Sequence, residues 1–162
     1  MKKKPSNSIV QLPTPSLRQL SADIAKDEYP EMKKLIKIMY RSMDENNGIG
    51  LAAPQIGLNI NIFVISREIA KQFGIPSAYI NPTVTSASSK EEVIEEGCLS
   101  VPGQFGLVKR AYTVTVTAYD EKGKQFTIVA NDIAARIIQH ESDHLKGTLI
   151  VDKFMKTQKK NI

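Results

Sequence analysis

The only two histidines of the chain, His140 and His144, lie four residues apart, and Glu141 directly follows the first of them. Residues i and i+4 lie on one face of an α-helix about one turn apart, so both imidazoles can reach the same cation. Glu141 lies about 100° further round the helix, close enough to address a water on that cation without being a ligand. This HExxH pattern predicts a helix with one face turned toward a metal, and Glu141 as a proton carrier.

Two imidazoles do not complete a catalytic metal site, which usually has three protein ligands and one open position. The longer HExxHxxGxxH pattern would place a third histidine at position 150, but this residue is Ile150, and no glutamate follows His144. Asp152 is one remaining candidate. The other is Cys98, the only cysteine, whose thiolate suits zinc or ferrous iron. A lone cysteine is most often a buried structural thiol, but a helix that lacks its third ligand favours Cys98.

Residues 48–55 (GIGLAAPQ) are a third landmark, because small residues let a backbone approach another group closely. We expect a loop from Gly48 to Gly57, with the side-chain amide of Gln55 as a donor at its far end. Tight packing alone would explain such a loop equally well, so its role depends on the other two segments.

Helix and strand patterns occur in blocks rather than in regular alternation. Apolar residues at helical spacing from Pro30 predict an amphipathic helix that ends near residues 46–48, and a second helix is expected over residues 132–146, with Asn131 as N-cap and Gly147 after its end. Strands are predicted at residues 60–65, at 78–80 before Asn81-Pro82, and at 108–119 and 125–129, which form a hairpin. This order favours an α+β fold with antiparallel sheet.

The length of 162 residues predicts one domain, which we place at residues 9–155 between basic tails at 1–8 and 156–162. The net charge of +5 comes from lysines at the two ends. Basic ends are compatible with transient association with an acidic assembly such as the ribosome, but not with specific nucleic-acid binding. No apolar run is long enough for a membrane span, and one cysteine excludes an internal disulfide, so we expect a cytoplasmic protein.

Three segments in one order resemble the signature motifs of the peptide deformylase family, written GxGLAAxQ, EGCLS and HExDH. They are residues 48–55, residues 96–100 and residues 140–144, and the resemblance spans roughly residues 9–155. It implies a small single α+β domain in which a central metal-binding helix is surrounded by antiparallel β-sheets.

The resemblance also implies roles for individual residues. Cys98, His140 and His144 would bind one divalent metal, Fe²⁺ in the cell and Zn²⁺ as isolated. Glu141 would be the proton shuttle, and Gln55 and the backbone N–H of Leu99 would bind the developing oxyanion. Substrate contacts are expected from the two motif segments that flank the metal, at Ile49, Gly50, Glu96 and Gly97.

The implied reaction removes the N-formyl group from the initiator formyl-methionine of newly made polypeptides and releases formate. The partner would be the formyl-methionyl nascent polypeptide, and we expect a monomer. Two other functions remain open on the sequence: an HExxH-type metallopeptidase that cleaves peptide bonds, and a non-catalytic metal-binding protein associated with the ribosome.

The chain departs from the family pattern at three places. Phe105 stands where several relatives carry arginine near the substrate backbone. Arg136 stands where relatives often place an apolar residue that lines the methionine pocket, and we expect it to be a surface arginine or one whose head leaves a packed helix. Only about ten residues follow Asp152, too few for the long terminal helix of many bacterial members.

Overall fold

The structure is a computed structural model that describes residues 8–156. The basic tails expected at the two ends therefore lie almost wholly outside the described residues. The helices are α1 (Tyr29–Glu45), α2 (Arg67–Phe73) and α3 (Asp132–Leu145), and four short 3₁₀ turns are η1 (Pro15–Arg18), η2 (Lys26–Glu28), η3 (Ala53–Ile56) and η4 (Ile150–Asp152). The strands are β1 (Gly50–Ala52), β2 (Ile62–Ile65), β3 (Ala78–Ala87), β4 (Glu91–Cys98), β5 (Val101–Ala111), β6 (Thr113–Tyr119) and β7 (Gln125–Asn131).

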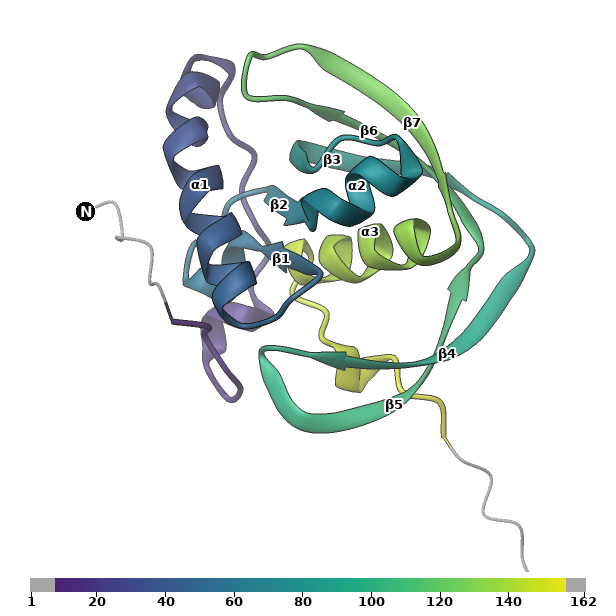
Figure 1. Cartoon of the computed structure of the whole chain (residues 1–162). Helices are drawn as coiled ribbons and strands as arrows, with labels where there is room; N and C mark the ends of the chain where they lie inside the picture. Colours follow the sequence, from purple (N-terminus) through teal and green to yellow (C-terminus); the bar gives the residue numbers. More distant parts are fainter. Residues whose placement is uncertain (1–7, 157–162) are drawn as a thin grey trace, which may run out of the picture.

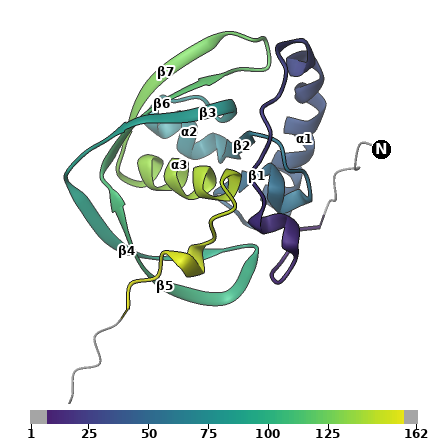
Figure 2. The ribbon, with the colours of Figure 1, turned by 180° about the vertical axis from the view of Figure 1, so that it is seen from behind.

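All strand pairs are antiparallel and form two sheets. Five strands pair in the order β1-β2-β3-β6-β7, and β4 and β5 form a separate two-stranded sheet. Helix α3 lies between the two sheets, as Figures 1 and 2 show from opposite sides. The predicted α+β fold with a central helix among antiparallel sheets is therefore confirmed. Within residues 8–156, no helix combines the length and the apolarity that crossing a bilayer requires.

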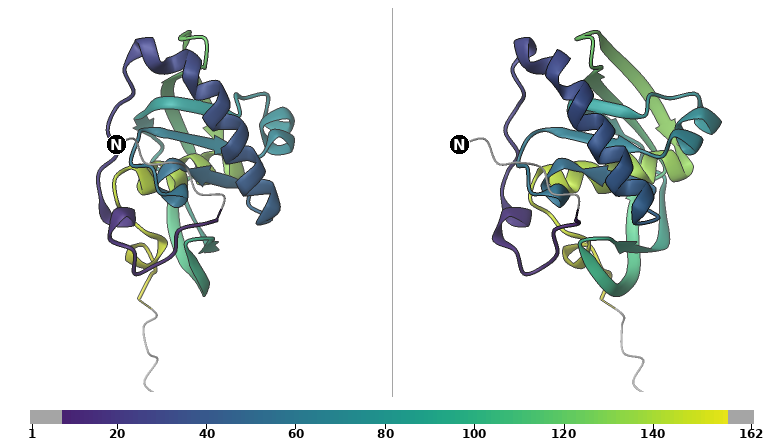
Figure 3. Two further views of the ribbon diagram at one scale, coloured as in Figure 1. Left: turned by 90° about the vertical axis from the view of Figure 1, so that its left-hand side faces the viewer. Right: turned by 60° about the vertical axis from the view of Figure 1, so that its left-hand side comes forward.

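The five-stranded sheet is covered on both faces, which explains why every side chain of β2 is buried. Phe63 and Ile65 pack toward α3, whereas Ile62 and Val64 pack toward α1, because successive side chains of a strand point to opposite faces. Figure 3 shows α1 crossing the strands on the face away from α3. Helix α3 is thus held in the interior, with its apolar residues against the sheet.

The predicted strand over residues 108–119 is wrong as one element. It divides at Tyr112, because β5 pairs with β4 while β6 pairs with β3 and β7. At this bend the N–H of Tyr112 donates to the carbonyl of Lys90, and the N–H of Asp132 donates to the carbonyl of Tyr112. The β4–β5 pair on one side of the bend and the β3–β6 pair on the other form one long ribbon, which passes from the two-stranded sheet to the five-stranded sheet (Figure 1).

The predicted end of a strand at Asn81-Pro82 is also wrong. Asn81 adopts a positive φ of 48°, and the pairing of β3 with β6 is irregular there, but the strand resumes and runs on to Ala87. The Asn81 side chain stabilises this irregularity, because its amide accepts from the N–H of Ile24 and donates to the carbonyl of the same residue.

Helix α3 begins at the predicted residue and ends within one residue of the predicted end. Asn131 precedes the helix but makes no capping hydrogen bond through its side chain. Gly147 follows the helix with a φ of 71°, the left-handed conformation that favours glycine after a helix end. The other early segment, residues 48–57, was expected to be a loop, but it forms the short strand β1 and the turn η3.

Candidate metal centre

Three side chains with nitrogen or sulfur donors meet between β4 and α3. Cys98 ends β4, and His140 and His144 lie one turn apart on α3. One ligand atom from each lies within 4.8 Å of the other two, and the Cys98 Sγ is 3.2 Å from the His144 Nε2. Asp152, the other candidate for third ligand, lies outside this group, because its carboxylate pairs with Arg18 and accepts from the N–H of Leu149.

Glu96 orients the first of the two histidines. Its Oε2 lies 3.0 Å from the Nδ1 of His140, which turns the Nε2 of that ring toward the centre. Arg110 donates to both oxygens of Glu96, from Nε to Oε1 at 2.7 Å and from Nη2 to Oε2 at 3.0 Å. Burial raises the pKa of Glu96, but the hydrogen bonds from His140, Arg110 and Arg136 outweigh this effect and lower the pKa to about 2.

The two histidines differ in their electrostatics. Burial lowers the pKa of His144 well below 6.5, and the nearby His140 and Arg110 act in the same direction. Burial also opposes protonation of His140, but hydrogen bonds to Cys98 and Glu96 outweigh it and raise the pKa to about 10. The anionic groups around His140 therefore favour a positive charge at this place.

Glu141 is a buried carboxylate that points into the same space. Burial raises its pKa to about 7, although His140 and Arg110 lower it, and its Oε2 has no hydrogen-bond partner. A carboxyl group with a pKa near neutrality can both accept and release a proton under ordinary conditions.

Gln55 is held by its own loop. The N–H of Ala52 donates to the Gln55 Oε1 at 2.9 Å, so the Nε2 points away from β1. This Nε2 lies 3.6 Å from the Cys98 Sγ and 3.3 Å from the Oγ of Ser100. The side-chain amide of Gln55 therefore presents its donor group beside the sulfur of Cys98.

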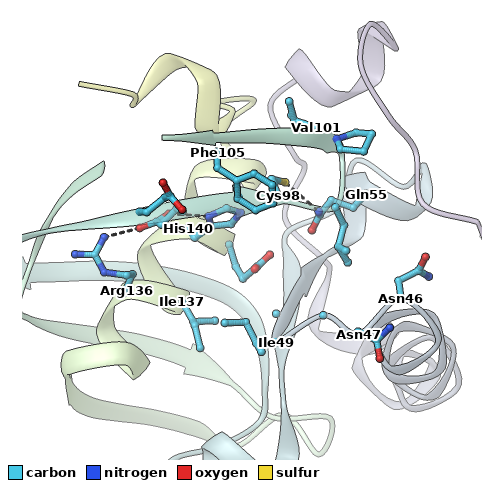
Figure 4. A pocket seen from close by; sticks show the side chains of 18 of the residues that line it. Asn46, Asn47, Ile49, Gln55, Cys98, Val101, Phe105, Arg136, Ile137 and His140 are labelled. Carbon is cyan, nitrogen blue, oxygen red and sulfur yellow. Dashed lines mark hydrogen bonds and ion pairs between the residues drawn. The ribbon is translucent and has the colours of Figure 1, made fainter. Parts of the chain in front are cut away.

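A cavity of about 580 Å³ opens over these groups (Figure 4). Cys98, His140, Glu141 and Gln55 line it, whereas His144 is buried behind them. The remaining sequence-predicted residues, Ile49, Gly50, Glu96, Gly97 and Leu99, also line the cavity. The structure thus brings every predicted site residue to one place.

Phe105 and Arg136, two residues at which the chain departs from the family pattern, both line this cavity but differ in exposure. Phe105 is 68% exposed, and its ring lies against the backbone of Gly97 in the cavity wall. The expectation of a surface Arg136 is wrong, because only 6% of this residue is exposed. Its guanidinium donates to Glu96 Oε1 at 2.6 Å and to the carbonyls of Glu92 and Val108.

Arg110 and the contacts of Asp143 were not predicted from the sequence. Arg110 lies two residues after the buried Val108 on β5, so it occupies an inward-facing position, and it is 5% exposed. Its Nη1 donates to the Asp143 Oδ2 at 2.9 Å. The sequence pattern that could have indicated it is a charged residue at an inward-facing position of a strand, because a buried charge needs a partner of opposite charge.

The donor set fits a divalent metal. A thiolate and two imidazoles within 4.8 Å of one another are ligands that zinc and ferrous iron prefer, and Glu96 provides the carboxylate partner that metal-bound histidines commonly have. The unpartnered oxygen of Glu141 lies close to this donor set without belonging to it.

Comparison with known proteins gives one consistent result. The family model "Polypeptide deformylase" matches residues 6–160. A peptide deformylase of Microchaete diplosiphon is 42% identical over 137 residues, which cover 85% of this chain and 73% of that protein.

Solved structures agree with this match. A peptide deformylase from Synechococcus elongatus in complex with actinonin has a TM-score of 0.85 at 38% identity, covering 94% of this chain and 83% of that one. A class I type b peptide deformylase from Acinetobacter baumannii with Met-Ala-Ser bound has a TM-score of 0.82 at 29% identity, covering 95% and 100%.

Proposed function

This chain belongs to the peptide deformylase family and is therefore a hydrolase, and from that premise we propose how its residues act. It removes the N-formyl group from the formyl-methionine that begins newly made polypeptides, and it releases formate. The observation that carries this proposal is the convergence of Cys98, His140 and His144 beside a buried, unpartnered Glu141 oxygen at the bottom of a cavity. Met-Ala-Ser bound to the Acinetobacter relative supports a peptide that begins with methionine.

Cys98, His140 and His144 hold one divalent metal in this proposal. When bound, such a metal acidifies water and polarises a carbonyl oxygen. The donor set suits both Fe²⁺ and Zn²⁺; we propose Fe²⁺ in the cell, with Zn²⁺ as a replacement in isolated protein.

Glu141 carries the proton between the two halves of the reaction. Its carboxylate accepts a proton from the attacking water, whose oxygen forms a bond to the formyl carbon. The C–N bond then breaks, and Glu141 returns the proton to the leaving amine nitrogen. A pKa of about 7 suits both directions of transfer, because neither the acid nor the base form is scarce near neutral pH.

Gln55 and the backbone N–H of Leu99 stabilise the negative charge that develops on the formyl oxygen. The hydrogen bond from Ala52 fixes the Gln55 Oε1, so the amide keeps its donor toward the cavity without reorganisation during the reaction. Loss of one such donor typically raises a barrier by about 3–4 kcal/mol.

Ile49, Gly50, Glu96 and Gly97 contribute to the walls of the substrate cavity, which takes the methionine and the formyl group. The partner is a formyl-methionyl nascent polypeptide in the cytoplasm. The enzyme acts as a monomer and associates transiently with the ribosome through its basic chain ends. One domain at residues 9–155 contains all of these groups.

The test is formate release from a formyl-methionyl peptide by anaerobically purified protein of known metal content. Glu141→Gln should lower turnover by about 10²–10⁴-fold, because the proton carrier is lost while the side-chain shape is kept. Its metal content should equal that of the unchanged chain. An N-acetyl-methionyl peptide and an unformylated peptide are the controls; cleavage of an internal peptide bond in the latter would instead support a metallopeptidase.

A further inference from the structure

Arg136 is a buried cation in the wall of the cavity, and its guanidinium is turned away from the cavity centre (Figure 4). Only 7% of its side chain is exposed. The Nη1 donates to Glu96 Oε1 at 2.6 Å and to the carbonyl of Val108 at 3.1 Å, and the Nη2 donates to the carbonyl of Glu92 at 2.8 Å. The guanidinium is therefore hydrogen-bonded within the protein. We take the aliphatic part of the side chain to be what lines the cavity.

The partner of Arg136 is the carboxylate that holds His140. The Oε1 of Glu96 accepts hydrogen bonds from Arg136 Nη1 and Arg110 Nε. The Oε2 accepts from Arg110 Nη2 and lies beside the His140 Nδ1. Arg110 on β5 holds the plane of this carboxylate through both oxygens, and Arg136 on α3 adds a third hydrogen bond, to Oε1, from another direction. Without Arg136, the carboxylate would be free to shift with Arg110 and away from His140.

Glu96 is a buried carboxylate, and Arg136 is one of its two guanidinium partners. The other partner, Arg110, also pairs with Asp143, which has a further contact with Lys153 at 3.7 Å. Removal of Arg136 would leave Glu96 with only the guanidinium that it shares with Asp143, and loss of one partner from a buried ion pair is strongly unfavourable. Glu96 would then gain water or move, and either change disturbs its hydrogen bond to His140.

From these contacts we propose that Arg136 is a positioning residue for the metal ligand His140, and that it acts through Glu96. The guanidinium of Arg136 donates to Glu96 and to the carbonyls of Val108 and Glu92. It holds Glu96 so that His140 keeps its Nδ1 on the carboxylate and its Nε2 toward the metal. This inference rests on the metal centre of the proposed function.

The experiment measures metal affinity rather than deformylation. Arg136→Met keeps a long, unbranched stem in the cavity wall and removes the guanidinium. We expect the affinity for Zn²⁺, measured by competition with a chromophoric chelator, to fall by about 10-fold or more, as changes around metal-bound histidines typically do. The visible absorption of the Co²⁺-loaded variant should also change, because the His140 ring is no longer fixed.

Arg18→Met is the matched control, because Arg18 also pairs with a carboxylate, Asp152, but contacts no member of the cluster. Its Zn²⁺ affinity and Co²⁺ spectrum should equal those of the unchanged chain. Arg136→Lys is a second variant that retains a cation for Glu96 but cannot reach both strand carbonyls, and it should recover most of the affinity.

A double-mutant cycle with Glu96→Gln separates positioning from a general structural role. If Arg136 acts through Glu96, Arg136→Met should change the affinity little once Glu96 is glutamine. Equal, additive losses in both backgrounds would overturn the proposal, and so would an unchanged affinity of Arg136→Met in a chain that binds one metal. A chain that binds no metal at all would instead reject the metal centre itself.

Discussion

At the scale of single residues, Gly50 sets the distance between β1 and the buried carboxylate. A Cβ added at this position would lie 2.3 Å from the Glu141 Oε1 and 2.9 Å from the Ile137 Cγ2, both closer than real contacts permit. The residue is therefore glycine because a backbone and a carboxylate must approach each other here, and any side chain would displace Glu141.

We predict that Gly50→Ala lowers formate release by about 100-fold or more, since a displacement of about 1 Å in a reacting group has effects of that size. The metal content should not change, because the three atoms nearest to the added methyl belong to Glu141 and Ile137 rather than to a metal ligand. Gly48→Ala is the control: its Cβ would meet the Leu99 Cδ1 at 3.0 Å and the Met43 Cγ at 3.1 Å, and these side chains can shift by the few tenths of an ångström needed, so the loss should be much smaller. Loss of metal in Gly50→Ala would contradict this explanation.

The candidate ligands and Glu141 could be predicted from sequence because helical spacing and donor chemistry are local properties. The contacts of Arg136 and Arg110 could not, since Glu96 lies 40 residues before the first and 14 before the second. Helical pattern alone does not reveal that an arginine on the inner face will find a buried carboxylate on another strand.

At the scale of elements, the β4–β5 hairpin is bound to the end of the chain. Phe154 bridges to Val108, and the N–H of Met155 donates to the carbonyl of Leu107. The ring of Phe154 lies directly on Gly106, where a Cβ would be 2.5 Å from the ring. A short segment after η4 thus pairs with β5 and packs against the hairpin.

Gly106→Ala should separate Phe154 from β5 and destabilise the fold by about 1–3 kcal/mol, the usual effect of overpacking. The free energy of unfolding in urea measures this change. Phe154→Leu in the same chain should restore part of the loss, because the smaller side chain leaves room for the methyl. If the double variant is less stable than Gly106→Ala alone, the ring is not the cause.

The elements themselves were only partly predictable. α1, α3 and the hairpin of β6 and β7 follow from periodicity and turn residues, and their positions were confirmed. The bend at Tyr112 was not, because apolar alternation continues through it and only the pairing partners change. Strand β4 was missed, since its charged residues face the cluster and solvent rather than a uniform apolar core.

At the scale of the whole molecule, the candidate centre lies where the two-stranded sheet meets α3, beside the ion pairs that also connect them. Cys98 comes from the two-stranded sheet, whereas both histidines come from the helix that packs on the five-stranded sheet. A metal held by all three side chains therefore links the hairpin to the main core.

Removal of the metal by a chelator should lower the melting temperature and loosen the hairpin first. A ligand present at 100 times its dissociation constant stabilises the folded state by about 2.7 kcal/mol. Hydrogen exchange should accelerate in β4 and β5 but not in β2, whose side chains are all buried between α1 and α3. Uniform acceleration in both sheets would show that the metal does not act as a link.

The order of the ligands along the chain has a consequence for synthesis. Cys98 emerges from translation more than forty residues before His144, and the helix that carries both imidazoles belongs to the last part of the described fold. A prematurely terminated product that lacks this helix keeps only an isolated thiol. The metal centre can therefore form only after α3 has been synthesised.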